Sequence, residues 1–147
     1  MPLFPMYVNL EDKKIVIFGS GDVAERKYRK LTEFAVHILV ISKERPSFVL
    51  PEENFIWDVY HEKYLEGAFL AIAATSDSRI NHRIAEDCKR RGIFSDSATS
   101  KEDCTFTFPS VVRRGEIVIG ISSSGNFPAL TKDISCLLYT SLRLKKF

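Results

Sequence analysis

The sequence of 147 residues predicts an α/β fold, and three observations support this prediction. Short apolar runs rich in β-branched residues recur along the first hundred residues, which is typical of strands buried on both faces of a parallel sheet. Amphipathic segments with helical spacing separate these runs. A glycine-rich turn, Gly19 to Ala24, joins the first apolar run to the first amphipathic segment. Together these features predict a Rossmann-like, doubly wound parallel sheet, followed by a small α+β segment.

The elements of the first part are expected from the apolar runs and their spacing. The expected strands are residues 14–18, 36–41, 55–60, 68–74 and a fifth that starts at 93–94. The expected helices are residues 22–34 and 77–91. Gly92 follows the second helix, at the position where a left-handed residue commonly ends a helix. We expect residues 1–108 to form one nucleotide-binding domain.

The character of the chain changes after residue 104. Residues 106–109 and 116–122 are expected to be strands, separated by a turn at Arg113-Arg114-Gly115. Pro128 can open a helix that runs toward Leu144, because proline is favoured at the first helical position. The apolar stripe of this helix comprises Leu130, Ile134, Leu137, Leu138 and Leu142. Since segment 109–147 cannot easily bury this stripe alone, we expect it to mediate homodimerisation.

Composition argues against several classes of protein. Hydrophobic residues make up 45% and charged residues 27%, an ordinary globular balance. The net charge of +2 is too even to indicate nucleic-acid binding. No apolar run approaches the roughly 20 residues of a membrane span, and the N-terminus lacks the basic region of a signal peptide. The three cysteines form no CxxC pair, so we expect no metal site, and we expect a cytoplasmic protein without nucleic-acid or membrane partners.

The turn Gly19-Ser20-Gly21-Asp22-Val23-Ala24 matches the pattern G-x-G-x-x-G/A. In this pattern the first glycine permits the tight turn, the second lets the backbone approach a pyrophosphate, and the last small residue allows close helix packing. The free N–H groups and the dipole of the helix then face the phosphates. We therefore expect a dinucleotide cofactor. The residues expected to bind it here are Gly19, Ser20, Gly21, Asp22 and Val23.

The end of the second strand bears on the choice between NAD and NADP. NAD enzymes often place an acid there, on the ribose hydroxyls, but this chain has Ser42 and Lys43, with Glu44 one residue later. Ser42 could hydrogen-bond a hydroxyl, whereas Lys43 with Arg45 could suit a 2′-phosphate. These residues leave the choice of cofactor open.

The fourth strand ends in small residues, Ala74 and Thr75. Ligands of such folds bind outside the carboxyl ends of the strands, where small residues let a cofactor lie flat. The other interpretation is that Ser76 or Asp77 caps the following helix. Both interpretations can hold together.

Longer motifs resemble a known family. The stretches FPMYVNLEDKKIVIFGSGDVAERK, FLAIAATSDSRIN and FTFPSVVRRGEIVIGISSSGNFPAL, in this order, are similar to the N-terminal module of siroheme synthase. Free-standing members are precorrin-2 dehydrogenases, some with ferrochelatase activity. The resemblance runs from Pro5 to about Leu138 and is far more specific than a glycine loop.

The resemblance implies NAD-dependent dehydrogenation of precorrin-2 to sirohydrochlorin, on the way to siroheme or cobalamin. It also implies a Rossmann domain followed by a dimerisation region, and thus a homodimer. Members commonly continue into a further helical domain, which we expect to be short or missing here.

Precorrin-2 carries many carboxylates and needs cations around a roomy cleft. The expected substrate-binding cations are Arg26, Lys27, Arg113 and Arg114, and for each the other interpretation is a solvated face. The run Ser122-Ser123-Ser124-Gly125 could supply hydroxyl and N–H groups to a substrate carboxylate, or it could simply be a loop before the last helix.

Dehydrogenation also requires a base. The family has an aspartate after the fifth strand, and the matching position here is Thr99, which is no base at neutral pH. Asp96 and Asp103 are nearby carboxylates, although Asp103 can also be a surface charge, and His82 lies on a helix face expected to be exposed. The candidate catalytic residues are Asp96, Thr99 and Ser123. We expect dehydrogenation rather than metal chelation.

Two other classes remain open at this point. A regulatory domain that senses a bound dinucleotide has this size, but it usually carries an acid after the second strand. A methyltransferase that binds S-adenosylmethionine would favour the same acid. The regulatory domain would also not need the segments F-P-S-x-x-R-R-G and S-S-S-G, and the methyltransferase ranks lower because Ser42 and Lys43 stand where it would favour the acid.

Overall fold

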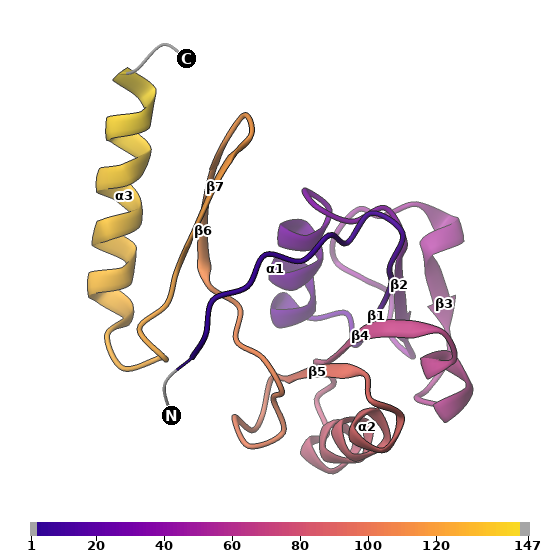
Figure 1. The fold of residues 1–147 in the computed structure, drawn as a ribbon. Coiled ribbons are helices and arrows are strands. Elements are labelled where there is room, and N and C mark those ends of the chain that lie inside the picture. Colours follow the sequence, from indigo (N-terminus) through magenta and orange to yellow (C-terminus); the bar gives the residue numbers. More distant parts are fainter. Residues whose placement is uncertain (1–2, 145–147) are drawn as a thin grey trace. The chain divides into compact units, whose positions relative to one another are not determined.

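The computed structural model describes residues 3–144, which form two compact units (Figure 1). The larger unit is Val8–Phe106, and the smaller combines Met1–Tyr7 with Thr107–Phe147 as far as these are described. The larger unit contains five parallel strands in the order β3-β2-β1-β4-β5. Their bounds are β1 Lys14–Phe18, β2 Ile38–Ser42, β3 Phe55–Trp57, β4 Ala68–Ala73 and β5 Phe94–Ser97. This sheet confirms the predicted α/β, Rossmann-like class.

Helices cover both faces of this sheet. α1 (Asp22–Leu31) and α2 (Ser78–Arg91) lie on opposite faces, and two short 3-10 helices, η1 (Glu52–Asn54) and η2 (Glu62–Leu65), flank β3 (Figure 1). Successive residues of a strand point to opposite faces, so every apolar residue of β1 meets a helix layer. Ile15, Val16, Ile17 and Phe18 are accordingly at most 1% exposed.

Several expected boundaries are wrong by a few residues. The first helix ends at Leu31 rather than residue 34, because the N–H groups of Phe34 and Ala35 both donate to the Leu31 carbonyl and close a turn. The second strand begins at Ile38 rather than residue 36, and Val36 is 68% exposed. The third strand ends at Trp57 rather than residue 60.

The expected end of the second long helix is confirmed at Gly92. This residue has φ 69 and donates its N–H to the carbonyls of Cys88 and Lys89. Its left-handed backbone closes the helix without the steric cost that a side chain would add.

The smaller unit consists of an antiparallel hairpin and a long helix. The elements are β6 Ser110–Arg114, β7 Ile117–Ile121 and α3 Pro128–Leu144. The expected strand at residues 106–109 is wrong, since the strand begins only after Pro109, which has no N–H to donate to a ladder. The expected turn is also displaced, because Arg113 and Arg114 are strand residues and the register leaves Gly115-Glu116 as the connection.

α3 presents part of its apolar stripe to solvent, as the sequence indicated. Leu130 is 55% and Leu137 is 70% exposed. A hydrogen bond of 2.8 Å between the Ser110 and Ser135 hydroxyls ties the helix to β6. Within residues 3–144, no helix is both long and apolar enough to cross a membrane.

Candidate functional site

The glycine loop follows β1 at the carboxyl end of the parallel sheet. Gly19 has φ 117, and its N–H donates to the Ile41 carbonyl at 2.9 Å. A Cβ atom at Gly19 would lie 2.1 Å from the Ala74 carbonyl oxygen. The first glycine of the motif is therefore required by both its backbone angle and the close passage of the segment after β4.

The N-terminus of α1 is open and has no side-chain cap. Its N-cap is Gly21, which offers no side-chain cap, whereas Asp77 caps α2 by accepting a 2.9 Å hydrogen bond from the Arg79 N–H. Nothing lies within 4 Å of a Cβ built on Gly21. First-turn N–H groups without a side-chain cap, at an open and glycine-lined helix start, suit the pyrophosphate of a dinucleotide.

A pair of hydroxyl groups links this loop to the end of β2. The oxygens of Ser20 and Ser42 lie 2.9 Å apart, and the Ser42 hydroxyl also accepts the Glu44 N–H at 3.1 Å. Lys43 and Arg45 are both exposed. The end of β2 thus presents hydroxyls and cations, and no acid occupies the position where NAD enzymes often bind the ribose.

Asn81 organises the loop after β4, and the sequence reasoning missed it. The amide of this fully buried residue accepts bonds from the Thr75 N–H at 3.0 Å and the Thr75 hydroxyl at 2.7 Å. It also donates to the Thr75 carbonyl at 3.1 Å and to the Thr99 hydroxyl at 3.3 Å. The available signal was a polar residue at helical spacing from Ile84 and Ala85, on the buried face of the predicted helix.

Two expected site residues, Lys27 and Asp96, form an ion pair. The Lys27 Nζ and Asp96 Oδ2 atoms lie 3.2 Å apart, with side chains 22% and 10% exposed. The Cys104 sulfur lies 3.9 Å from the other Asp96 oxygen. One candidate for substrate binding, on α1, and one for catalysis, on β5, therefore contact each other.

Thr99 and Asp103 lie on the loop that follows β5. Thr99 is exposed, and its hydroxyl lies 3.3 Å from that of Ser97. Asp103 is not a surface charge, since its side chain is 10% exposed and lies 2.9 Å from Nδ1 of His82. His82 itself is 62% exposed, as its predicted helix face required.

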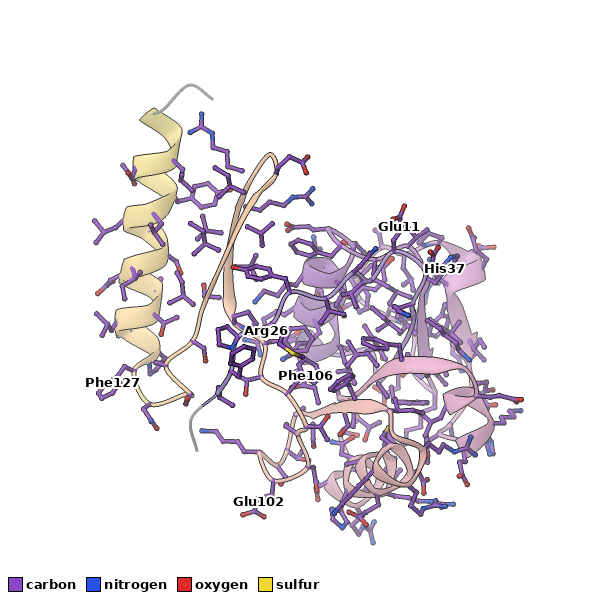
Figure 2. All side chains as sticks on the ribbon, in the orientation of Figure 1. Glu11, Arg26, His37, Glu102, Phe106 and Phe127 are labelled. Carbon is purple, nitrogen blue, oxygen red and sulfur yellow. The ribbon has the colours of Figure 1, made fainter. Side chains whose placement is uncertain are left out.

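The expected arginines differ in their surroundings. Arg26 lies exposed on α1 (Figure 2). Arg113 and Arg114 are successive residues of β6, so their side chains leave opposite faces of the hairpin.

The serine run between β7 and α3 uses its own hydroxyls within the loop. Ser122 accepts the Ser124 N–H at 3.2 Å, and Ser123 accepts the Phe127 N–H at 3.2 Å. The tandem left-handed residues Ser124 (φ 55) and Gly125 (φ 79) turn the chain into α3. This run borders a cavity of about 440 Å³ between α3 and the hairpin.

Comparisons with known proteins agree with this geometry. A family model described as "Putative NAD(P)-binding" matches residues 6–110. The siroheme synthase of Psychrobacter arcticus is 34% identical over 145 residues, covering 95% of this chain and 26% of that protein. The siroheme synthase of Psychrobacter cryohalolentis is 36% identical over 145 residues, covering 95% and 28%.

A solved structure shares the fold. SirC, a precorrin-2 dehydrogenase, superposes with a TM-score of 0.71 at 21% identity, covering 95% of this chain and 71% of its own. The chain spans little more than a quarter of the length of the two siroheme synthases. The chain therefore belongs to the NAD(P)-binding family whose model spans residues 6–110, and its sequence relatives are siroheme synthases.

Proposed function

We propose that this chain is an NAD-dependent dehydrogenase that oxidises precorrin-2 to sirohydrochlorin in siroheme biosynthesis. The observation that carries the proposal is the open, glycine-lined N-terminus of α1, held against the segment after β4, in a chain similar to siroheme synthases over nearly its whole length. The residues that we propose to hold the dinucleotide are Gly19, Ser20, Gly21, Asp22, Val23, Ser42, Lys43, Ala74 and Thr75. When bound, the dinucleotide supplies an acceptor for two electrons and one hydrogen nucleus.

The substrate is expected to bring several carboxylates, which require cations and hydrogen-bond donors. We propose Arg26, Lys27, Arg113 and Arg114 as the cations, with Ser122, Ser124 and Gly125 as donors. Lys27 already faces Asp96, so it contributes less free charge to a ligand than the exposed Arg26. Mutation of Arg26 is therefore expected to weaken substrate binding more than mutation of Lys27.

The candidate catalytic groups are Thr99, Asp96 and Ser123. Thr99 can orient a substrate group through its hydroxyl but cannot take a proton at neutral pH. Asp96 is ionisable but is held by Lys27, and Ser123 lies beside the Phe127 N–H at the start of α3. We accordingly expect little metal insertion into sirohydrochlorin, because the hydroxyl at Thr99 is a poor ligand and a poor base for that step.

We further propose a homodimer and a cytoplasmic location. The support for a dimer is the exposed stripe of α3, where Leu130 and Leu137 are mostly exposed. Light scattering of the protein and of a Leu130→Glu, Leu137→Glu variant tests this. A monomeric parent protein would exclude the dimer.

An anaerobic assay tests the dehydrogenase directly. The protein is mixed with precorrin-2 and NAD⁺, and NADH and the sirohydrochlorin spectrum are followed together. Stoichiometric formation of both products is expected. Binding of NAD⁺ without any turnover would instead identify a regulatory domain that senses the cofactor. Addition of Fe²⁺ or Co²⁺ to sirohydrochlorin tests chelation separately.

A further inference from the structure

The dehydrogenation proposed above removes two hydrogens from the macrocycle, and only one of them leaves with its electron pair. The other leaves as a proton and needs an acceptor. Such a group must be ionisable or carry a free lone pair, must be exposed enough to meet a bulky ligand, and must lie near the carboxyl ends of the strands. The described residues around β4, β5 and their loops can be compared on these three conditions.

Asp96, Cys104 and Thr99 each fail at least one condition. The Asp96 side chain is 10% exposed and paired with Lys27, so it cannot meet a ligand without breaking that pair. Burial raises the pKa of the Cys104 thiol, which therefore stays protonated at neutral pH. Thr99 is exposed but does not ionise in this range.

His82 and Asp103 satisfy the first two conditions as a pair. Nδ1 of His82 lies 2.9 Å from Oδ1 of Asp103, and the carboxylate is 10% exposed while the imidazole is 62% exposed. An ionised carboxylate can only accept, so the Nδ1–H donates and Nε2 carries the lone pair. The imidazole therefore presents its basic nitrogen on the exposed side of the pair.

The loop that carries Asp103 is held in place by its neighbours. The Ser95 hydroxyl donates to the Asp103 carbonyl at 3.0 Å, and the Cys104 N–H donates to the Lys101 carbonyl at 3.2 Å. A carboxylate fixed in this way orients the imidazole and stabilises its protonated form.

His82 meets the third condition by its place on α2. Asn81, the residue before His82, bonds both Thr75 after β4 and Thr99 after β5. His82 therefore lies one residue after Asn81, which joins the loops that follow β4 and β5. We propose that His82 is the catalytic base of the dehydrogenation and that Asp103 is its positioning residue.

The two hydrogens leave the macrocycle by different routes. One C–H bond of the macrocycle breaks, and its hydrogen and both electrons leave to the dinucleotide oxidant. A second N–H or C–H bond breaks, its electrons form the new double bond of the macrocycle, and its proton bonds to Nε2 of His82. The resulting imidazolium faces Asp103 and later releases the proton to water. Arg79 and Glu86 lie one turn from His82 on either side along α2, and Lys101 and Glu102 lie on the loop that carries Asp103.

Kinetics of His82→Gln and Asp103→Asn test the proposal, because both side chains keep their approximate shape. We expect His82→Gln to lower kcat by roughly 100-fold, with KM for precorrin-2 and Kd for NAD⁺ unchanged. In the parent enzyme kcat should fall toward acid pH as the imidazole takes a proton, and this limb should vanish in His82→Gln. Asp103→Asn should lower kcat by about 10-fold or more and move the acid limb, which a purely structural role would not do. Imidazole added to His82→Ala should restore part of the rate.

A readout without turnover accompanies the kinetics. Nitrogen NMR of the imidazole in the protein alone should show the proton on Nδ1, and Asp103→Asn should remove this preference. Glu102→Gln, which neutralises an exposed carboxylate on the same loop, serves as the matched control and should keep the acid limb. A parent enzyme that turns over while His82→Gln keeps its rate and pH profile would overturn the base. A parent enzyme that binds NAD⁺ but never turns over would overturn the proposed function itself.

Discussion

Replacing Gly19 by alanine should lower the free energy of unfolding of the larger unit and should also abolish cofactor binding. The backbone at this position has φ 117, a conformation that side chains rarely adopt. Its added Cβ would lie 2.1 Å from the oxygen and 2.6 Å from the carbon of the Ala74 carbonyl. Both atoms belong to backbone, so the segment after β4 must move away from β1.

The magnitude follows from two costs. A sparsely populated backbone angle costs about 1–3 kcal/mol. Moving the Ala74 carbonyl also strains the adjacent 2.8 Å hydrogen bond from the Ala74 N–H to the Phe18 carbonyl, worth about 1 kcal/mol. We expect the free energy of unfolding to fall by about 3 kcal/mol, which lowers Tm by about 6–12 °C for a chain of this size.

Gly21→Ala is the matched control. Nothing lies within 4 Å of its Cβ, and its φ of −85 suits any residue, so stability should change by less than about 1 kcal/mol. The added methyl group instead occupies the place of the phosphate, and NAD⁺ affinity should fall by at least about 10-fold, or 1.4 kcal/mol. Urea titration and calorimetric binding measure the two effects. A Gly19→Ala protein as stable as the parent, or a Gly21→Ala protein with unchanged NAD⁺ affinity, would refute the assignment of the loop.

Four further outcomes are expected. Asn81→Ala removes the amide that pairs with the N–H and carbonyl groups of the half-buried Thr75, so it should cost about 2–4 kcal/mol in urea denaturation and weaken NAD⁺ binding. Burial raises the pKa of Asp87, but the hydrogen bonds from Tyr60 and Arg90 outweigh it and hold this pKa below its usual range. Because the folded pKa is the lower one, the ionised carboxylate stabilises the fold above the unfolded pKa, and this stabilisation is lost as pH falls through the folded pKa. Asp87→Asn should therefore flatten the decline of Tm toward acid pH. Burial raises the pKa of Cys88 to about 12, so a thiol reagent at mildly alkaline pH should label the exposed Cys136 and spare Cys88 until the protein is unfolded. Lys43→Glu with Arg45→Glu should weaken NADP⁺ binding by about 10-fold or more, and NAD⁺ binding much less, if these exposed cations face the 2′ position; equal losses would show that they do not.

The sequence predicted the strands of the larger unit because burial on both faces leaves a local signature. A run such as residues 14–18 has no polar alternation to confuse it with a surface strand. The strand at residues 106–109 was misplaced because its phenylalanines alternate like a strand, while Pro109 blocks the ladder and the pairing begins at Ser110. Boundaries such as Leu31 depend on which carbonyl each N–H finds, and composition does not record that choice.

Some residues of the candidate site were likewise predictable from the sequence, and others were not. The glycine loop was predictable, since the needs for a tight turn and an open helix start act on adjacent residues. Asn81, by contrast, acts through residues on two other loops, and the Lys27–Asp96 pair joins a helix to a distant strand. Only the folded sheet brings such groups together, so the spacing of residues along the sequence could not predict their contacts.

The ion pairs Lys27–Asp96 and His82–Asp103 differ in how far their side chains are exposed to solvent. Lys27–Asp96 is the less exposed pair, and a buried pair that loses one partner leaves an uncompensated charge, so its mutation should be felt mainly as lost stability. His82–Asp103 buries only the carboxylate and leaves the imidazole to solvent, so its mutation removes little packing. We therefore expect Asp96, three residues before Thr99, to contribute more to stability than to proton transfer. The group that can exchange a proton with a ligand is His82, which Asp103 holds from the loop after β5.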